Sequence, residues 1–148
     1  MNESTLSDKQ MIVEAVESVH RYRDHAMWEK ITDYFVEKPF IDDTELTKEA
    51  AGERNVRSLI SNWRNELRNY FYATRHRIQS IAVKQKNAKE AEVVSPVMGQ
   101  YFVNDRGHRY VLNVEGTYTY GMVKKSGRWK IGKLSFTLSK QELKPIGL

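Results

Sequence analysis

Thr74-Arg75-His76-Arg77-Ile78 is the stretch at which the hydrophobic pattern of this 148-residue chain changes its period. Before it, apolar residues recur every three or four positions, as on one face of an α-helix. After it, apolar and polar residues alternate, as on a strand with one buried face. Helices followed by consecutive strands predict a single α+β domain over residues 1–148, with a mainly antiparallel sheet.

Helical structure is expected in two regions before this stretch. Ser7-Asp8-Lys9-Gln10 fits a capping box and predicts the start of the first helix. Its apolar stripe is long for one helix, so we expect a break between His20 and Asp24. A second helix is expected over residues 53–72, and Phe40-Ile41 is expected as a short strand or an extended connection after Pro39. The apolar stripe of the first helical region comprises Ile12, Ala15, Val16, Val19, Ala26, Met27, Ile31 and Phe35.

Four strands are expected after the change of period, over residues 76–84, 90–103, 109–124 and 128–139. The alternation predicts that His76, Ile78 and Ser80 share the inner face of the first of them. The third has the clearest pattern, with one face formed by Tyr110, Leu112, Val114, Gly116, Tyr118, Tyr120 and Met122.

Composition and charge restrict the partners. The chain has no cysteine, which excludes disulfides and thiolate chemistry. A polar N-terminus and the lack of an apolar run of roughly 20 residues favour a cytoplasmic protein without a membrane partner. The net charge is +5, but acidic residues lie between many of the arginines and no glycine-rich phosphate loop occurs. We therefore do not expect a nucleic-acid partner.

Three short motifs carry a family resemblance: Tyr22-Arg23-Asp24-His25-Ala26-Met27-Trp28, the stretch around His76, and Ser126-Gly127-Arg128-Trp129-Lys130-Ile131. In this order, the chain resembles SnoaL-like members of the nuclear transport factor 2-like superfamily. The resemblance implies N-terminal helices packed in the concave face of a curved sheet, a cystatin-like cone or α+β barrel. It also implies a pocket for a small apolar or partly polar molecule and a homodimer formed through the sheet.

By similarity to scytalone dehydratase, Asp24 and His76 are the expected catalytic residues in the cavity. The chain departs from that enzyme because Arg23 stands where the dehydratase has a tyrosine, and because no second strand histidine is evident. A carboxylate beside an imidazole can orient it and stabilise its charged form during proton transfer. Phenolic hydroxyls can donate hydrogen bonds to a developing enolate. The expected substrate-binding residues are Tyr118, Tyr120 and Trp28. We expect the site to use no cofactor and no metal.

Other interpretations of these residues stay open. Asp24 could instead cap a second helical segment, and His76 could be a structural histidine. The tyrosine face of residues 109–124 could form the dimer surface, and the three tryptophans could simply belong to the core. His20, His25 and His108 are expected at the surface or in loops.

Two functions follow, with nucleic-acid binding as a third and weaker alternative. The first is a cofactor-free lyase, isomerase or cyclase that uses an Asp–His acid–base pair. The second is a module of the same fold that binds a ligand or a partner chain without turnover.

Overall fold

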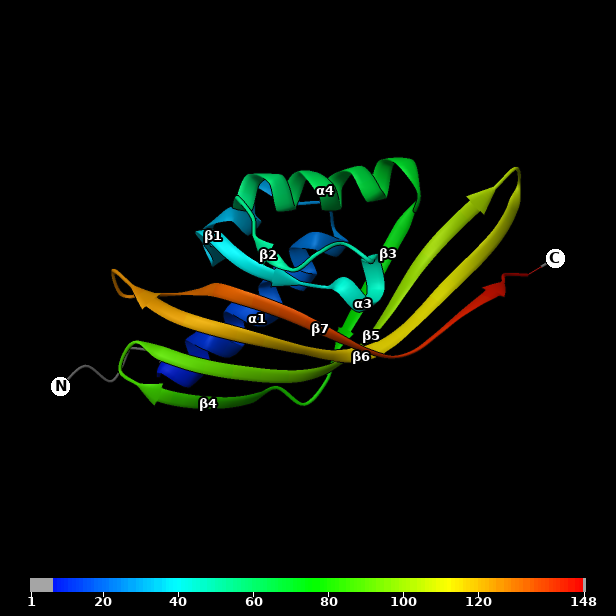
Figure 1. Ribbon diagram of the computed structural model, residues 1–148. Helices are drawn as coiled ribbons and strands as arrows, with labels where there is room; N and C mark the ends of the chain where they lie inside the picture. Colours follow the sequence, from blue (N-terminus) through cyan, green and yellow to red (C-terminus); the bar gives the residue numbers. More distant parts are fainter. Residues whose placement is uncertain (1–6, 148) are drawn as a thin grey trace.

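The strands form a strongly curved sheet in the computed structural model, which describes residues 7–147 (Figure 1). The strand order is β2-β1-β7-β6-β5-β3, and β4 pairs with the remaining part of β5. All pairs are antiparallel except β1 with β7. The strands are β1 (Phe35–Asp42), β2 (Gly52–Glu53), β3 (Ala73–Ile78), β4 (Ala82–Asn87), β5 (Glu90–Asp105), β6 (His108–Lys125) and β7 (Arg128–Pro145). The helices are α1 (Asp8–Asp24), α2 (Trp28–Ile31), a 3-10 turn (Thr32–Tyr34), α3 (Thr44–Thr47) and α4 (Val56–Asn69).

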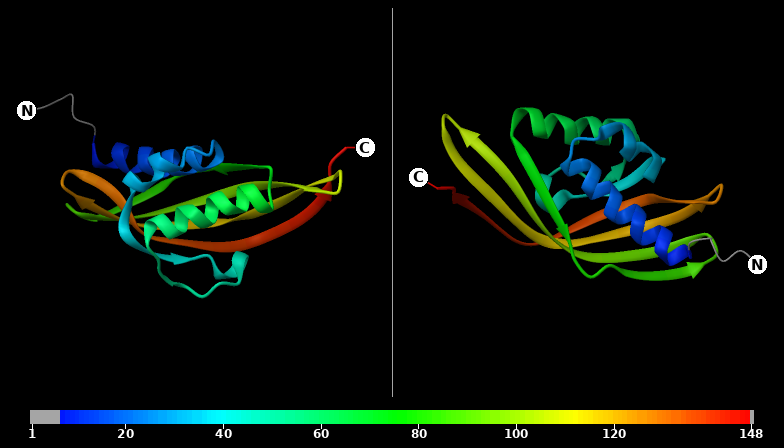
Figure 2. Two further views of the ribbon diagram at one scale, coloured as in Figure 1. Left: turned by 90° about the horizontal axis from the view of Figure 1, so that it is seen from above. Right: turned by 180° about the vertical axis from the view of Figure 1, so that it is seen from behind.

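The two long helices, α1 and α4, lie on the concave side of the sheet (Figures 1 and 2). Helix α1 packs against β3, β4 and β7, whereas α4 packs against β1. This arrangement confirms the expected α+β cone. Within residues 7–147, no helix combines the length and the apolar run that crossing a bilayer requires.

Helix α1 is fixed at its first residue. Its capping box is formed as predicted: the Ser7 hydroxyl accepts from the Gln10 amide, and the Gln10 side chain accepts from the Ser7 amide. Asp8 accepts hydrogen bonds from the Trp129 indole and from Lys124, both at 3.0 Å. These bonds lower the pKa of Asp8 to about 2. The start of the helix is thereby attached to the end of the sheet where β6 turns into β7.

The helical boundaries differ from the prediction in several places. Helix α1 continues without interruption to Asp24, so the expected break coincides with the helix end. Phe35 begins β1 and does not belong to the helical stripe. Helix α4 starts at Val56, three residues later than expected, because the Asn55 side chain accepts from the Arg57 amide and caps it.

The strand expected over residues 76–84 is two strands, β3 and β4, which share the long partner β5. Between them, Ser80 has a φ of 37° and is exposed, so its expected place on the inner face is wrong. The Ser95 hydroxyl donates to the Gln79 carbonyl at 2.6 Å and fixes this connection. His76 and Ile78 do lie on the inner face, because they alternate with exposed arginines.

The other three expected strands are confirmed as β5, β6 and β7, each longer than predicted. The inner face of β6 is buried as expected, with Tyr118 6% and Tyr120 0% exposed. The alternative that these tyrosines form a dimer surface is therefore wrong. Strand β7 carries irregularities opposite Gly116 and opposite Gly121, which are typical of points where a sheet bends.

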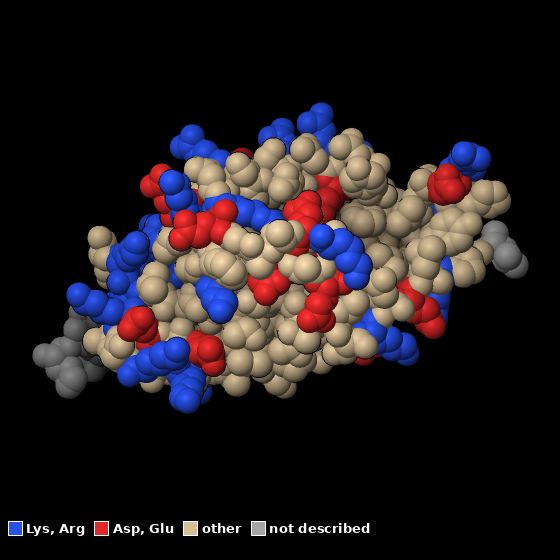
Figure 3. Space-filling model, in the orientation of Figure 1, with Lys and Arg blue, Asp and Glu red and all other residues tan. Residues whose placement is uncertain are grey.

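Charged side chains of both signs are mixed on the face shown in Figure 3. Lysines and arginines lie among aspartates and glutamates there, as the interleaving in the sequence predicts. The expectation that the chain has no nucleic-acid partner stays a prediction.

We expect Gly116→Ala to destabilise the protein by about 1–3 kcal/mol, the usual effect of overpacking a core. A Cβ at this position would meet the Thr137 carbonyl and the Phe136 ring closer than real Cβ atoms approach other atoms. Urea denaturation measures the loss. Gly132→Ala is the control, because the nearest atom to its Cβ is 3.7 Å away. Equal losses in both variants would contradict the steric explanation.

Candidate functional site

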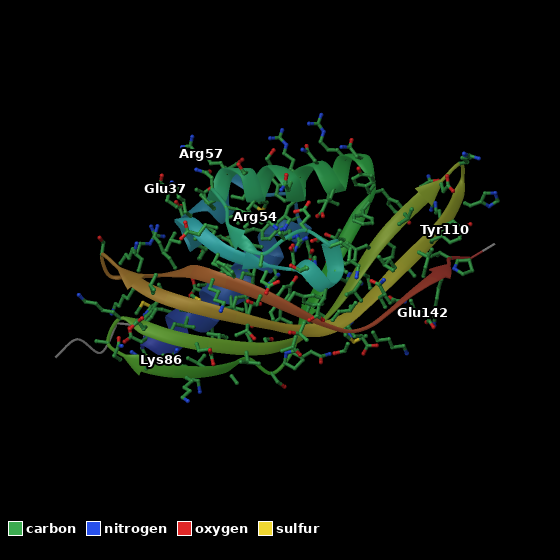
Figure 4. The ribbon with its side chains drawn as sticks, viewed as in Figure 1. Glu37, Arg54, Arg57, Lys86, Tyr110 and Glu142 are labelled. Atoms are coloured by element: carbon green, nitrogen blue, oxygen red, sulfur yellow. The ribbon has the colours of Figure 1, made fainter. Side chains whose placement is uncertain are left out.

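A cavity of about 420 Å³ lies between α3, α4 and the inner face of the sheet. Its volume falls within the range of small-ligand pockets. Arg54, which follows β2 (Figure 4), also lines the cavity and pairs with Asp43 at 3.6 Å and Glu49 at 3.3 Å. The apolar part of the wall is formed by Leu59, Trp63, Phe71, Leu112, Leu134 and Phe136.

Asp24, the last residue of α1, is bound to β3 by three hydrogen bonds. Its Oδ1 accepts from the Thr74 hydroxyl at 3.0 Å and from His76 Nδ1 at 2.6 Å, and its Oδ2 accepts from the His76 amide at 2.6 Å. The alternative that Asp24 caps the next helix is wrong, because α2 has Met27 as its N-cap and no side-chain cap. The structure therefore brings Asp24 and His76 into direct contact.

The other ring nitrogen of His76 faces Tyr101. His76 Nε2 lies 2.9 Å from the Tyr101 hydroxyl, and Tyr101 lines the cavity whereas His76 does not. The His76 side chain is only 1% exposed. Burial lowers the pKa of His76, helped by the Arg23 charge and opposed by Asp24. Burial also raises the pKa of Tyr101, so its hydroxyl keeps its proton.

The hydrogen bonds of His76 define a directed chain. Since the Asp24 carboxylate accepts, Nδ1 of a neutral His76 carries the hydrogen and Nε2 accepts from Tyr101. The order of donation is therefore from Tyr101 to His76 to Asp24. Gly99, which faces His76 across the β3–β5 pair, leaves room for this chain. A Cβ at Gly99 would stand 3.2 Å from the Tyr101 ring and 3.6 Å from the His76 ring.

His20 was expected at the surface, but it is buried with 1% exposure. Its Nε2 lies 2.7 Å from the Tyr120 hydroxyl, and its ring centroid lies 5.7 Å from that of His76. Burial lowers the pKa of His20 well below its usual range. Its position, four residues after the buried Val16, continues the apolar stripe and could have indicated burial. His25 and His108 are exposed, as expected.

A second hollow, of about 270 Å³, lies beside the Asp24–His76 contact. Asp24, His76 and His20 contribute to its wall, together with residues of α1. The two catalytic candidates therefore sit between this hollow and Tyr101, which separates them from the larger cavity.

The expected substrate-binding residues lie in three different environments. Tyr118 lines the larger cavity, whereas Tyr120 is fully buried behind it against His20. Trp28 begins α2 and packs partly buried against the core, away from the cavity wall. Trp63, in contrast, does line the cavity, and Trp129 is buried with its indole donating to Asp8.

Most wall residues were not singled out from the sequence as site residues, among them Arg23, Glu66 and Tyr101. Arg23 follows the buried Val19 by four positions, so it continues the apolar stripe of α1. Tyr101 follows the buried Val97 by four residues on the same face of β5. In both cases the periodicity indicated burial. Across residues 7–147, no three His, Asp or Glu side chains converge to hold a metal ion.

Comparisons with known proteins connect this geometry to a family. The sequence model of the SnoaL-like domain matches residues 4–135. No curated protein matches the chain significantly.

Solved structures similar to this one share the fold at low sequence identity. The Kfla4162 protein from Kribbella flavida is 19% identical, with a TM-score of 0.81 over 91% of this chain and 93% of that chain. A candidate scytalone dehydratase from Novosphingobium aromaticivorans is 16% identical, with a TM-score of 0.76 over 91% and 86%. The hexachlorocyclohexane dehydrochlorinase LinA-type3 from Novosphingobium barchaimii is 11% identical, with a TM-score of 0.75 over 93% and 89%. At these identities the likeness extends to the fold alone.

We expect the free energy of unfolding to fall as the pH drops below about 6.5, the value at which an unfolded histidine takes up a proton. Folding holds His20 and His76 neutral to lower pH, so acid favours the unfolded chain. Each such histidine contributes up to about 1.4 kcal/mol per pH unit. Urea denaturation between pH 7.5 and pH 5 measures this slope.

His20→Gln removes one of the two titrating groups and should flatten the slope. The exposed His108→Gln is the matched control and should leave it unchanged. A His20→Gln variant with the slope of the unmodified protein would contradict the assignment.

Proposed function

The chain belongs to the SnoaL-like domain family, and from this premise we propose that its cavity binds a small, partly apolar molecule. Support comes from the composition of the wall, which combines aromatic and aliphatic side chains with polar and charged ones, Arg23, Tyr101 and Tyr118 among them. Pockets for small ligands have this composition, because apolar contacts supply affinity and a few polar groups supply orientation. The cavity, at about 420 Å³, is large enough for a ligand of one or two fused rings.

We also propose that the chain is a cofactor-free lyase, isomerase or cyclase in which Asp24 and His76 form the acid–base pair. The observation that carries this proposal is the hydrogen-bonded chain from Asp24 through His76 to the Tyr101 hydroxyl at the cavity wall. A base buried beside a fixed carboxylate suits general acid–base catalysis at neutral pH.

The proton transfer can be written through Tyr101. The phenolic oxygen takes a proton from a substrate carbon beside a carbonyl, while its own proton passes to His76 Nε2. His76 becomes an imidazolium held against Asp24, and the electron pair of the broken C–H bond moves onto the carbonyl oxygen. The enolate then either expels a leaving group, closes a ring or regains the proton at another carbon.

Binding without turnover is the second candidate, and one observation favours it. The Tyr101 side chain separates His76 from the larger cavity, so no ligand there would touch the imidazole directly. In this interpretation, the Asp24–His76 contact serves to attach α1 to β3, and the cavity holds its ligand unchanged.

Deuterium exchange into 2-tetralone distinguishes the two candidates. This bicyclic ketone has acidic hydrogens beside its carbonyl, and their replacement in D₂O is followed by NMR. We expect the protein to accelerate the exchange over buffer at the same pH. His76→Gln should lower the acceleration about 100-fold, the usual contribution of a general base, and Tyr101→Phe should lower it as well.

His25→Gln is the control, because His25 is exposed at the same end of α1 and bonds only the Arg21 carbonyl. If 2-tetralone binds and its hydrogens exchange no faster than in buffer, the catalytic proposal fails and the binding module stands. An acceleration that persists in His76→Gln would remove His76 from the mechanism.

We further propose that two copies pair through the outer face of the sheet, as the family resemblance implied. Val94 and Met98 project outward from β5 with 37% and 39% exposure, and Thr119 stands opposite Val94 on β6. Exposed apolar side chains on a sheet face favour association of this kind. The cytoplasmic location expected from the sequence also stays a prediction.

Met98→Glu should convert the dimer into a monomer in sedimentation velocity. The new carboxylate would stand directly opposite Glu115 and add like charge to the proposed interface. Tyr70→Glu, at a 69% exposed position after α4, is the control. An unmodified protein that sediments as a monomer at micromolar concentration would contradict the proposal.

A further inference from the structure

Arg23 is a buried cation in the wall of the larger cavity, and the proton-transfer chain described above does not use it. It lies in the last turn of α1 with 8% of its surface exposed. Its guanidinium stands over the ring of Trp63 at 4.2 Å from the centroid. This stacking covers one flat face of the guanidinium and leaves its N–H donors at the edges.

The anionic partner of Arg23 is loosely placed. Arg23 Nη2 lies 3.5 Å from Glu66 Oε1, longer than the 2.7–2.9 Å of a strong charge-assisted hydrogen bond. Within residues 7–147, Glu66 is the one carboxylate at ion-pair distance from Arg23, and the Tyr118 hydroxyl also interacts with its guanidinium. The guanidinium has five donors, so N–H groups remain for a ligand beside these two partners.

Glu66 competes with an anionic ligand for Arg23, but it is not firmly held in the site. Its side chain is 35% exposed, and burial raises its pKa, although Arg23 opposes the shift. The cavity's other cation, Arg54, already has two carboxylates, Asp43 and Glu49. Arg23, in contrast, has one carboxylate partner, at 3.5 Å, and its side chain is 9% exposed.

We propose that Arg23 recognises an anionic oxygen of the ligand, and that the cavity takes small aromatic or alicyclic carboxylic acids. This inference rests on the proposed function, since it names the substrate class of the same cavity. The apolar wall would hold the ring system, and the guanidinium would bind the carboxylate through its N–H edge. Tyr101 and Tyr118, which line the cavity with Arg23, would lie near the carbon that bears the acid group.

A pair of ligands of equal shape tests this proposal: 2-naphthoate and 2-naphthamide. Tryptophan fluorescence follows binding, because Trp63 lies in the cavity wall. We expect the carboxylate to bind at least about tenfold more tightly than the amide, since a hydrogen bond to a charged group contributes that much. Arg23→Gln should abolish the preference, so that the two ligands bind with similar affinity.

Glu66→Gln is the reciprocal variant and should act in the opposite direction. It removes the competing carboxylate but keeps its size, so the affinity for 2-naphthoate should rise several-fold while that for 2-naphthamide stays constant. This variant keeps the proposal testable if Arg23→Gln does not fold, which circular dichroism would reveal.

The outcomes separate this inference from the proposed function. Equal affinity for the two ligands, or a preference that survives in Arg23→Gln, overturns the role of Arg23 and leaves the binding cavity intact. A preference that is unaffected in Glu66→Gln contradicts the competition on which the inference depends. If neither ligand binds, both the inference and the small-molecule cavity are wrong.

Discussion

The carboxylate of Asp24 is the group on which the helical and strand layers depend for their relative position. Three hydrogen bonds from β3 end on it, one from Thr74 and two from His76. The same contacts that seat α1 on the sheet also set the hydrogen of His76 on Nδ1 and leave Nε2 as an acceptor. Folding and the chemistry of the site therefore share one interaction, and a structural role for His76 does not compete with a catalytic one.

Two consecutive residues of α1 serve opposite sides of the site. Neighbouring positions on a helix are about 100° apart, so Arg23 reaches the cavity wall whereas Asp24 reaches β3. The buried cation then influences the neighbouring groups through space: it lowers the pKa of His76 and opposes the effect of burial on Tyr101. The first influence favours the neutral form of His76, whereas burial outweighs the second and Tyr101 keeps its proton.

The parts of this structure that follow from periodicity could be predicted, and the parts set by single contacts could not. Alternation gave the inner face of β6 and the inward side of β3, and the capping box located the start of α1. The turn at Ser80 depends on a left-handed backbone and on the Ser95 hydroxyl, for which strand periodicity carries no signal. The contact of Asp24 with His76 was predicted from the family resemblance. Alternation indicates that Tyr101 is buried, but it does not indicate that its hydroxyl contacts His76.

The length of helix α1 fixes the distance between two places on the sheet. Its 17 residues span about 25 Å, with Asp8 attached to Trp129 at one end and Asp24 attached to His76 at the other. Because a helix resists stretching, this fixed length sets how far apart those two places on the sheet can lie, and with it the curvature between them. Insertion of one residue into α1 would lengthen the helix by about 1.5 Å and rotate Asp8 by about 100° relative to Asp24. The two side chains could then not both reach their partners on the sheet. The width of the cone is thus encoded in the length of a helix.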